Sequence, residues 1–242
     1  MKISAMTRCG AGKSASDDRI LVGGRILCST SENVCAEFCS DNITCGVVGI
    51  ADGVGGNAGG DIAAQYVCER IYGCSPDMDD IAGVNAGLLE LSQKTPGREK
   101  MASTYSGLFL TENKPAKLFH IGNTRVYSIQ GGYLKQLTTD MTTYNYYMSL
   151  GRVEEAQQCR RSEITACFGG GTNRLFRPQF IDITLSGSVL MTSDGIHDYI
   201  DIDKLEQLLS SGEKDASICR TLISIALEAG SEDDMSVVLL RL

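Results

Sequence analysis

Aspartates stand next to apolar, strand-like stretches at four places along the chain. They are Asp17 and Asp18 before 19–22, Asp52 after 47–51, Asp194 after 189–193, and Asp233 and Asp234 before 236–240. Carboxylates at strand ends can converge at one rim of a sheet, where they repel one another unless a divalent cation neutralises them. Hard oxygen ligands of this kind suit Mg²⁺ or Mn²⁺. The pattern therefore predicts a metal site assembled from distant parts of the chain.

A glycine follows both Asp52 and Asp194. We expect Gly53 and Gly195 to permit a tight turn and to let a backbone carbonyl approach a metal, because glycine has no side chain in the way. Asp198 follows one helical turn after Asp194, so a helix there would place both carboxylates on one side. A single Asp-Gly pair indicates only a turn, but four acidic sites in the same context are much harder to attribute to turns.

Short stretches rich in small and β-branched residues supply most of the expected elements. We expect strands at 19–28, 45–51, 105–111, 116–121, 124–130, 133–137, 180–185, 187–193 and 236–240. Gly131-Gly132 is typical of a two-residue hairpin turn. Helical spacing of apolar residues predicts a helix after Gly59-Gly60 and further helices at 78–93, 202–210 and 215–229. Because consecutive strands joined by tight turns form antiparallel sheets, the expected class is α+β.

The charge balance and the beginning of the chain bear on partners and location. The 242 residues include 22 Lys and Arg and 30 Asp and Glu, which gives a net charge of −8. Such a chain lacks the basic surface of a nucleic-acid-binding protein. No apolar run approaches the roughly 20 residues of a membrane span, and the first residues do not have the pattern of a signal peptide. We therefore expect a cytoplasmic protein with neither nucleic acid nor a membrane as partner.

Ten cysteines occur in the chain, and in the cytoplasm their thiols stay reduced. Cys35, Cys39 and Cys45 lack the paired C-x₂-C spacing of zinc sites. Small buried or loop residues are the simpler interpretation, and a cysteine zinc site is the less favoured alternative.

The order of the acidic motifs resembles that of the metal-dependent PPM (type 2C) serine/threonine protein phosphatases, particularly the bacterial members. The four motifs are Lys13-x₄-Asp18, Ala51-Asp52-Gly53-Val54-Gly55-Gly56, Thr192-Ser193-Asp194-Gly195-x₂-Asp198 and Glu232-Asp233-Asp234-Met235-Ser236-Val237-Val238. Three more segments resemble family motifs, namely Met101-Ala102-Ser103-Thr104, Gly122-Asn123-Thr124-Arg125 and Leu137-Thr138-Thr139-Asp140. The ordered set spans nearly the whole chain, which makes it far more specific than one Asp-Gly pair.

The resemblance implies a fold, a reaction and a set of ligands. The fold is a sandwich of two antiparallel β-sheets flanked by α-helices, with 1–242 as one catalytic domain. The reaction is hydrolysis of phosphoserine and phosphothreonine in protein substrates, opposing a Ser/Thr kinase, by a water or hydroxide that bridges two Mn²⁺ or Mg²⁺ ions. The implied ligands are Asp52 on both ions, the Gly53 carbonyl on the second, Asp194 and Asp233 on the first, and Asp18 through an ordered water.

Three residues depart from the family pattern. Lys13 replaces the phosphate-binding arginine, so the charge is kept but the bidentate fork is lost. Asn123 replaces an aspartate that, in bacterial members, holds a third metal with Asp194 and Asp198. Because a neutral amide is a poorer ligand for a hard cation, we expect that third site to be weak or empty. Asp234 replaces an asparagine and adds charge near the metals.

The histidines and one long segment complete the implied site. Val54 stands where the family often has a general-acid histidine. We expect His197 to be a polar residue at the rim of the site rather than a catalytic acid, and His120 to be structural. Residues 140–178 correspond to a mobile flap in bacterial relatives. Its arginines are candidate substrate contacts, although solvated surface charge is the simpler role for each of Arg160, Arg161, Arg174 and Arg177.

Two other interpretations remain at this stage. Gly53-x-Gly55-Gly56-x₂-Gly59 mimics a dinucleotide fingerprint, but Asp52 would face the pyrophosphate that this turn should bind. A phosphatase-like binding or regulatory module without activity is the more serious alternative, weakly favoured by Lys13 and Asn123. Retention of the four motif aspartates argues against it.

Overall fold

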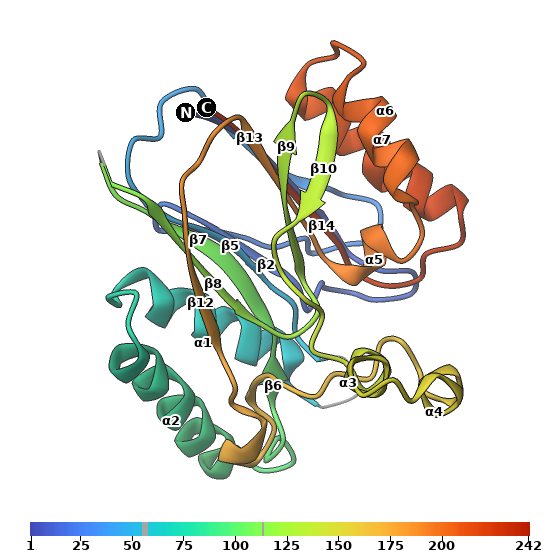
Figure 1. Ribbon diagram of the computed structural model, residues 1–242. Helices are drawn as coiled ribbons and strands as arrows, with labels where there is room; N and C mark the ends of the chain where they lie inside the picture. Colours follow the sequence, from blue (N-terminus) through green and yellow to red (C-terminus); the bar gives the residue numbers. More distant parts are fainter. Residues whose placement is uncertain (55–57, 113) are drawn as a thin grey trace.

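Two antiparallel sheets packed face to face form the centre of the molecule (Figure 1). The computed structural model describes residues 1–54, 58–112 and 114–242. Gly55 and Gly56 of the second acidic motif lie outside the described residues. The expected α+β sandwich flanked by helices is confirmed.

The first sheet brings together strands from both ends of the chain, and its neighbours pair antiparallel. In spatial order its six described strands are β10 (Tyr133–Gln136), β9 (Arg125–Gln130), β13 (Ser188–Thr192), β14 (Met235–Arg241), β1 (Lys2–Arg8) and β4 (Ala36–Ser40).

The second sheet is built mainly from the first half of the chain, again with antiparallel neighbours. Its six described strands are β12 (Gln179–Ile183), β8 (Ala116–Ile121), β7 (Tyr105–Leu110), β5 (Gly46–Ala51), β2 (Arg19–Val22) and β3 (Arg25–Leu27). A short pair, β6 (Ala102–Ser103) and β11 (Phe168–Gly169), lies beside it.

Helices cover the outer face of each sheet (Figure 1). The second sheet is covered by α1 (Gly60–Tyr72) and α2 (Met78–Lys94), and the first by α5 (Asp194–His197), α6 (Ile202–Leu209) and α7 (Asp215–Glu228). Two short helices, α3 (Thr143–Ser149) and α4 (Val153–Gln158), project from the body, and a 3-10 turn, η1 (Asn173–Leu175), precedes β12. Within the described part of the chain, no helix is both long and apolar enough to cross a membrane.

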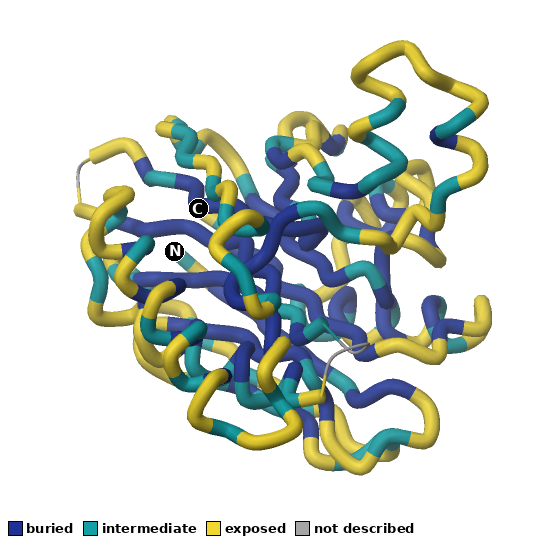
Figure 2. The backbone as a smooth tube through the Cα atoms, turned by 90° about the horizontal axis from the view of Figure 1, so that it is seen from below, coloured by how far each residue is buried: buried dark blue, intermediate teal, exposed yellow. Residues whose placement is uncertain are grey.

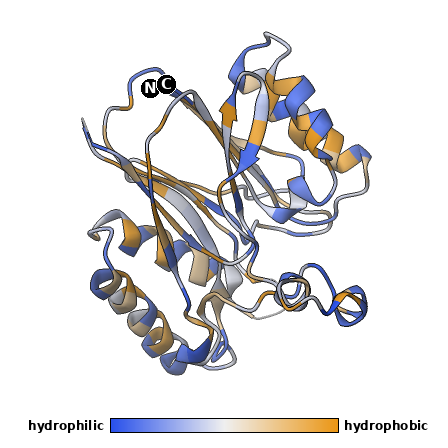
Figure 3. Ribbon diagram, in the orientation of Figure 1, coloured by the Kyte–Doolittle hydropathy of each residue, from blue (hydrophilic) through white to orange (hydrophobic). Residues whose placement is uncertain are grey.

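The strands at the centre of the sandwich are apolar on both faces, because each sheet is covered on both sides. On β5, Val48 and Ile50 point between the sheets, while Val47 and Ala51 face α1. The buried backbone runs through the middle of the molecule with exposed loops around it (Figure 2). Apolar residues on α6 and α7 face the first sheet in the same way (Figure 3). These layers fix the strands whose ends carry the aspartates.

Most of the expected strands and helices are present, but some of their boundaries differ from those predicted. The stretch 19–28 is a hairpin, β2–β3, and not one strand, because Gly23 (φ 51°) and Gly24 (φ 87°) reverse the chain. The expected turn at Gly131-Gly132 is confirmed, with φ of 59° and 88°. Strands β1 and β4 and helices α3 and α4 were not expected.

The four acidic motifs meet at one end of the sandwich. Asp52 follows the end of β5 and Asp194 follows β13, whereas Asp18 precedes β2 and Asp233 precedes β14. Since β5 is antiparallel to β2 and β13 is antiparallel to β14, the two pairs come together at matching strand ends. The sheet topology therefore brings the four acidic motifs together at one end of the sandwich, as the sequence pattern predicted.

The Tyr105 hydroxyl is a buried polar group without a hydrogen-bond partner among the described residues. The side chain is fully buried, and its oxygen packs where a Cβ on Gly49 or Gly107 would have to sit. Tyr105→Phe should therefore raise the free energy of unfolding by about 1 kcal/mol, because it removes an unpaired hydroxyl without leaving a large cavity. Urea denaturation measures the change, and a loss of stability would show that the hydroxyl has a partner in solution.

His120 on β8 is buried between two backbone segments. Its Nε2 lies 2.9 Å from the Thr139 carbonyl oxygen, which can only accept, so Nε2 carries the proton. Its Nδ1 lies 2.7 Å from Ser106 Oγ. Burial lowers the pKa of His120 below its ordinary 6.5, although the Thr139 carbonyl partly opposes this shift. The histidine is therefore a neutral, structural group.

Acidification should destabilise the folded protein through this buried, neutral histidine. As the pH falls through about 6.5, the unfolded chain binds a proton on His120 that the folded chain does not, so stability decreases. His120→Gln removes this contribution and keeps a donor for Thr139. In urea denaturations at about pH 7.5 and about pH 5, the variant should lose less stability than the wild type. Equal losses would contradict the assignment, and the pairwise comparison cancels the contributions of the aspartates.

Candidate active site

Three of the predicted aspartates line one cavity at the shared end of the two sheets. The cavity measures about 370 Å³, and Asp194 at the beginning of α5 is part of its lining. Its lining consists of Lys13, Asp52, Gly53, Val54, Thr104, Asn123, Ser162, Ile164, Asp194 and Asp233. Among the described residues, Lys13 is the only cationic side chain in this lining. Three carboxylates thus face one space with a single positive charge.

Asp18 is 1% exposed and does not line this cavity, but its charge acts on Asp52, which does. Its backbone N–H donates to Ser16 Oγ at 3.0 Å, but neither carboxylate oxygen has a hydrogen-bond partner among the described residues. Burial raises the pKa of Asp18 well above its usual range, the charge of Asp234 raises it further, and the nearby Ser236 hydroxyl opposes the shift only in part. A buried carboxylate without a donor is costly. Its position indicates that a positive group belongs nearby.

Asp52 is held by its backbone, which leaves its carboxylate directed at the cavity. Its N–H donates to Thr104 Oγ1 at 3.2 Å, and its carbonyl accepts from Thr104 N at 2.8 Å and from Ser103 Oγ at 3.2 Å. Burial raises the pKa of Asp52 well above its usual range, followed by repulsion from Asp194 and Asp18. The three carboxylates therefore lie close enough to repel one another.

Asp194 begins the single helical turn of α5. The Asp198 N–H donates to the Asp194 carbonyl at 3.0 Å, so the helical turn expected between them is present. The Asn123 amide donates to Asp194 Oδ2 at 3.0 Å. Burial and the charge of Asp233 raise the pKa of Asp194 to about 6. Asp198 is exposed and does not line the cavity.

Asp233 is 57% exposed, and its Oδ1 lies 3.4 Å from the Lys13 ammonium. Lys13 also contacts Asp17 at 3.4 Å and Asp234 at 2.8 Å. Burial favours the neutral amine, but the three carboxylates outweigh it and raise the pKa of Lys13 above its ordinary value. Lys13 is therefore charged, and it stands at the cavity where the sequence placed it.

Gly53 and Gly195 are required for a reason that differs from the one expected. Neither has a positive φ, so neither uses the backbone freedom of glycine. A Cβ on Gly53 would lie 2.4 Å from the Gly60 carbonyl, and one on Gly195 would lie 2.1 Å from the Asp234 carbonyl oxygen. Both glycines let backbones pack closely around the aspartates.

His197 is buried and does not reach the cavity, so its expected place at the rim is wrong. Its Nδ1 lies 2.9 Å from Thr192 Oγ1. Burial lowers the pKa of His197 well below its usual range, with the positive charge of Arg125 adding to the effect. The residue supports the end of β13.

No group of three or more His, Cys, Asp or Glu side chains in 1–54, 58–112 and 114–242 is arranged to hold an ion as it stands. The alternative zinc site at Cys35, Cys39 and Cys45 thus has no support, and all ten cysteines are free. In the acidic cavity, Asn123 and Lys13 occupy oxygens of Asp194 and Asp233. The donor set still fits hard divalent cations, because the unpartnered Asp18 and the repelling carboxylates need positive charge that one lysine does not supply.

The segment 140–178 forms one wall of the cavity through Ser162 and Ile164. Within the segment, the chain before α3 pairs antiparallel with the chain after α4, because Thr143 N donates to Glu163 O at 2.8 Å and Thr165 N donates to Met141 O at 2.7 Å. The pairing of β11 with β6 attaches the segment to the body. Helix α3 has no buried side chain. The candidate arginines Arg160, Arg161, Arg174 and Arg177 do not line the cavity.

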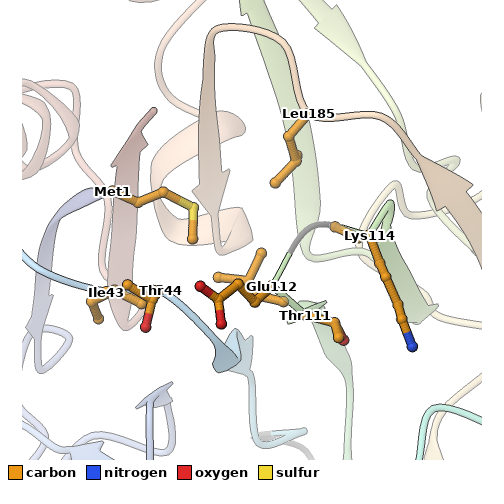
Figure 4. A pocket seen from close by; sticks show the side chains of 9 residues that line it. Met1, Ile43, Thr44, Thr111, Glu112, Lys114 and Leu185 are labelled. Carbon is orange, nitrogen blue, oxygen red and sulfur yellow. The ribbon is translucent and has the colours of Figure 1, made fainter.

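Thr104, Ser103 and Asp234 make supporting contacts that no sequence motif predicted. The motif at 101–104 contains Ser103 and Thr104, but it does not predict their hydrogen bonds with the Asp52 backbone. A separate cavity of about 260 Å³ lies at the opposite end of β7, beside Ile43, Glu112 and Leu185 (Figure 4). It contains none of the motif residues.

Comparisons with known proteins bear on this arrangement. No family model matches the chain. The chain is 26% identical over 250 residues to the serine/threonine protein phosphatase PstP of Mycobacterium tuberculosis, a match that covers 98% of this chain and 44% of PstP. It is 26% identical over 210 residues to the protein phosphatase PhpP of Streptococcus pneumoniae, which covers 80% of this chain and 84% of PhpP. The chain therefore spans less than half the length of PstP.

Solved structures show the same fold. The crystal structure of Mycobacterium tuberculosis PstP aligns with a TM-score of 0.77 at 24% identity, covering 100% of this chain and 99% of that one. The catalytic domain of PstP in complex with two manganese ions aligns with a TM-score of 0.74 at 22% identity and the same coverage. The resemblance inferred from the acidic motifs is thereby confirmed. The chain has the fold of the PPM phosphatases and is related, over nearly its whole length, to bacterial serine/threonine protein phosphatases.

Proposed function

We propose that the chain is a metal-dependent phosphatase that hydrolyses phosphoserine and phosphothreonine esters in proteins. The observation that carries the proposal is Asp18, a buried carboxylate without a hydrogen-bond partner among the described residues, next to a cavity lined by Asp52, Asp194 and Asp233. The relative PstP, which is named a serine/threonine protein phosphatase, supports the substrate class.

The implied cofactors are two Mn²⁺ or Mg²⁺ ions. Asp52 would contact both, the Gly53 carbonyl would contact the second, Asp194 and Asp233 would hold the first, and Asp18 would act through an ordered water. Bound ions supply an activated water nucleophile and neutralise the charge of the phosphoryl group. Asp198 belongs to the third site, which we propose is weak or empty because Asn123 replaces a carboxylate there.

The side chains of this protein position the reactants around that centre. The backbone contacts of Thr104 hold Asp52 in place, and Lys13 at the cavity edge attracts the substrate phosphate. Val54 and Ile164 give the cavity an apolar portion that limits solvent. Neither histidine lines this cavity, so water is the proton source for the leaving serine or threonine oxygen.

Residues 1–242 would act as one catalytic domain, with 140–178 as a flap beside the substrate. A Ser/Thr kinase would supply the phosphoproteins, and a cytoplasmic location follows from the sequence expectation. An inactive binding module would have no use for a buried Asp18 whose carboxylate has no hydrogen-bond partner in 1–54, 58–112 and 114–242.

Removing a proposed ligand should abolish activity without unfolding the protein. Asp52→Asn and Asp233→Asn should each lower Mn²⁺-dependent turnover of a phosphothreonine peptide by more than about 100-fold, since even residues that only support metal ligands contribute roughly 10–100-fold. Asp182→Asn, on an exposed pair with Lys117 far from the cavity, is the matched control and should stay near wild type. A folded wild type without metal-dependent turnover would overturn the proposed function.

A third ion should appear when position 123 becomes acidic. The Asn123 amide now directs a donor at Asp194 Oδ2, which blocks that oxygen from a cation. In crystals soaked in Mn²⁺, Asn123→Asp should raise occupancy beside Asp194 and Asp198. Asn123→Ala removes the donor without adding a ligand and serves as control. Unchanged density in Asn123→Asp would contradict this explanation of the third site.

A further inference from the structure

Asp234 and Asp233 are neighbours in sequence with opposite environments. The Asp233 side chain is 57% exposed, whereas that of Asp234 is 3% exposed. The Asp234 carboxylate accepts three hydrogen bonds, from Gly10 N at 2.7 Å, Asp17 N at 2.7 Å and Lys13 Nζ at 2.8 Å. A buried carboxylate that accepts three short hydrogen bonds has its hydrogen-bonding needs met within the protein.

These donors come from one loop, the connection between β1 and β2. Gly10 lies at the beginning of the loop and Asp17 at its end, so one carboxylate closes the loop at both sides. The backbone adds a further attachment, because Ala11 N donates to the Glu232 carbonyl at 3.1 Å. The packing is tight, since a Cβ on Gly10 would lie 2.4 Å from that same carbonyl oxygen.

Only an acid can make this set of contacts. Oδ1 accepts from Gly10, and Oδ2 accepts from both Asp17 and Lys13. An asparagine has an acceptor on one arm and a donor on the other, so one set of N–H groups would face another N–H. The ammonium of Lys13 supplies the opposite charge that burial of the carboxylate requires.

The loop carries two residues of the proposed site. Asp18 directly follows Asp17, whose amide Asp234 holds, and the buried Asp18 carboxylate acts on Asp52 of the cavity lining. Lys13 lies between Asp234 and Asp233, at the cavity edge. Displacement of the loop would therefore move a proposed metal-site residue and the proposed phosphate-binding residue together.

We propose that Asp234 is a positioning residue, whose carboxylate clamps the β1–β2 loop so that Asp18 and Lys13 are held in place for the metals and the substrate phosphate. The proposal rests on the proposed function for the roles of Asp18 and Lys13, but the clamp itself does not. It differs from a general electrostatic effect, in which Asp234 would merely add negative charge near the cations.

Asp234→Asn tests the clamp, with Glu232→Gln as matched control. The control removes the same charge from the same turn, but the Glu232 side chain is exposed and makes no hydrogen bond within the described residues. Amide hydrogen exchange of the metal-free protein is read by NMR, and Mn²⁺ affinity is measured by calorimetry. Neither readout requires turnover.

The clamp predicts a local pattern. In Asp234→Asn, the Gly10 and Asp17 amides should exchange at least about 10-fold faster, while amides of the β14 interior stay protected. Mn²⁺ affinity should fall by about 10-fold or more, the range found when residues that orient metal ligands are removed. Glu232→Gln should change both quantities by less than about threefold.

Three outcomes would overturn the proposal. They are wild-type exchange at Gly10 and Asp17 in a folded Asp234→Asn, wild-type Mn²⁺ affinity in that variant, or equal loss of affinity in Glu232→Gln. If Asp234→Asn does not fold, the wild type still decides, because exchange of its Gly10 and Asp17 amides at the rate of an unstructured peptide excludes the clamp. A protected loop in a protein that hydrolyses no phosphopeptide would instead refute the proposed function and leave the clamp standing.

Discussion

Mutual repulsion among desolvated carboxylates is the constraint on which the rest of this structure depends. Burial raises the pKa of Asp18, Asp52 and Asp194, and the charges of neighbouring aspartates raise it further. Such a cluster is stable only if the surrounding fold holds it and if positive charge compensates it. The sandwich supplies the first condition. Lys13 supplies part of the second, and divalent cations would supply the remainder.

The apolar layers are what make the holding possible. Strands β5 and β13 are buried on both faces before they deliver Asp52 and Asp194 to the cavity. Their side chains belong to the cores between the sheets and under the helices, so neither strand can shift to relieve the repulsion. Close backbone packing at Gly53 and Gly195 removes the remaining freedom. The packed cores therefore fix the positions of Asp52 and Asp194 at the cavity.

Much of this organisation could be predicted from the sequence. The aspartates that border apolar strands carried a recognisable pattern, and the helices α1, α2, α6 and α7 showed helical spacing because each buries one face. By contrast, α3 has no buried side chain, so its sequence has no apolar stripe from which a helix could be predicted. Strand β1 was missed because its buried positions include Ser4 and Thr7, which do not look apolar.

The contacts around the site were harder to foresee than the residues that form it. The hydrogen bond from Gly10 to Asp234 spans nearly the whole sequence, and no local pattern encodes such a pair. The reason for Gly53 and Gly195 was also hidden, because close approach of two distant backbones leaves no trace in the sequence around either one. His197 was misplaced for a similar reason, since neighbours in sequence to Asp194 can still turn into the core.

The pairing of β1 with β14 has a consequence for how the protein is made. Lys2 lies opposite Arg241, and both strands lie in the interior of the first sheet rather than at its edge. The entropy cost of closing so long a loop grows only slowly with its length, but the contact cannot form until both strands exist. During synthesis, the first sheet therefore waits for β14 to emerge from the ribosome, and so does the acidic cavity. A nascent chain carries Asp18 and Asp52 long before it can gather them with Asp233, which keeps the site unassembled until the fold is able to hold it.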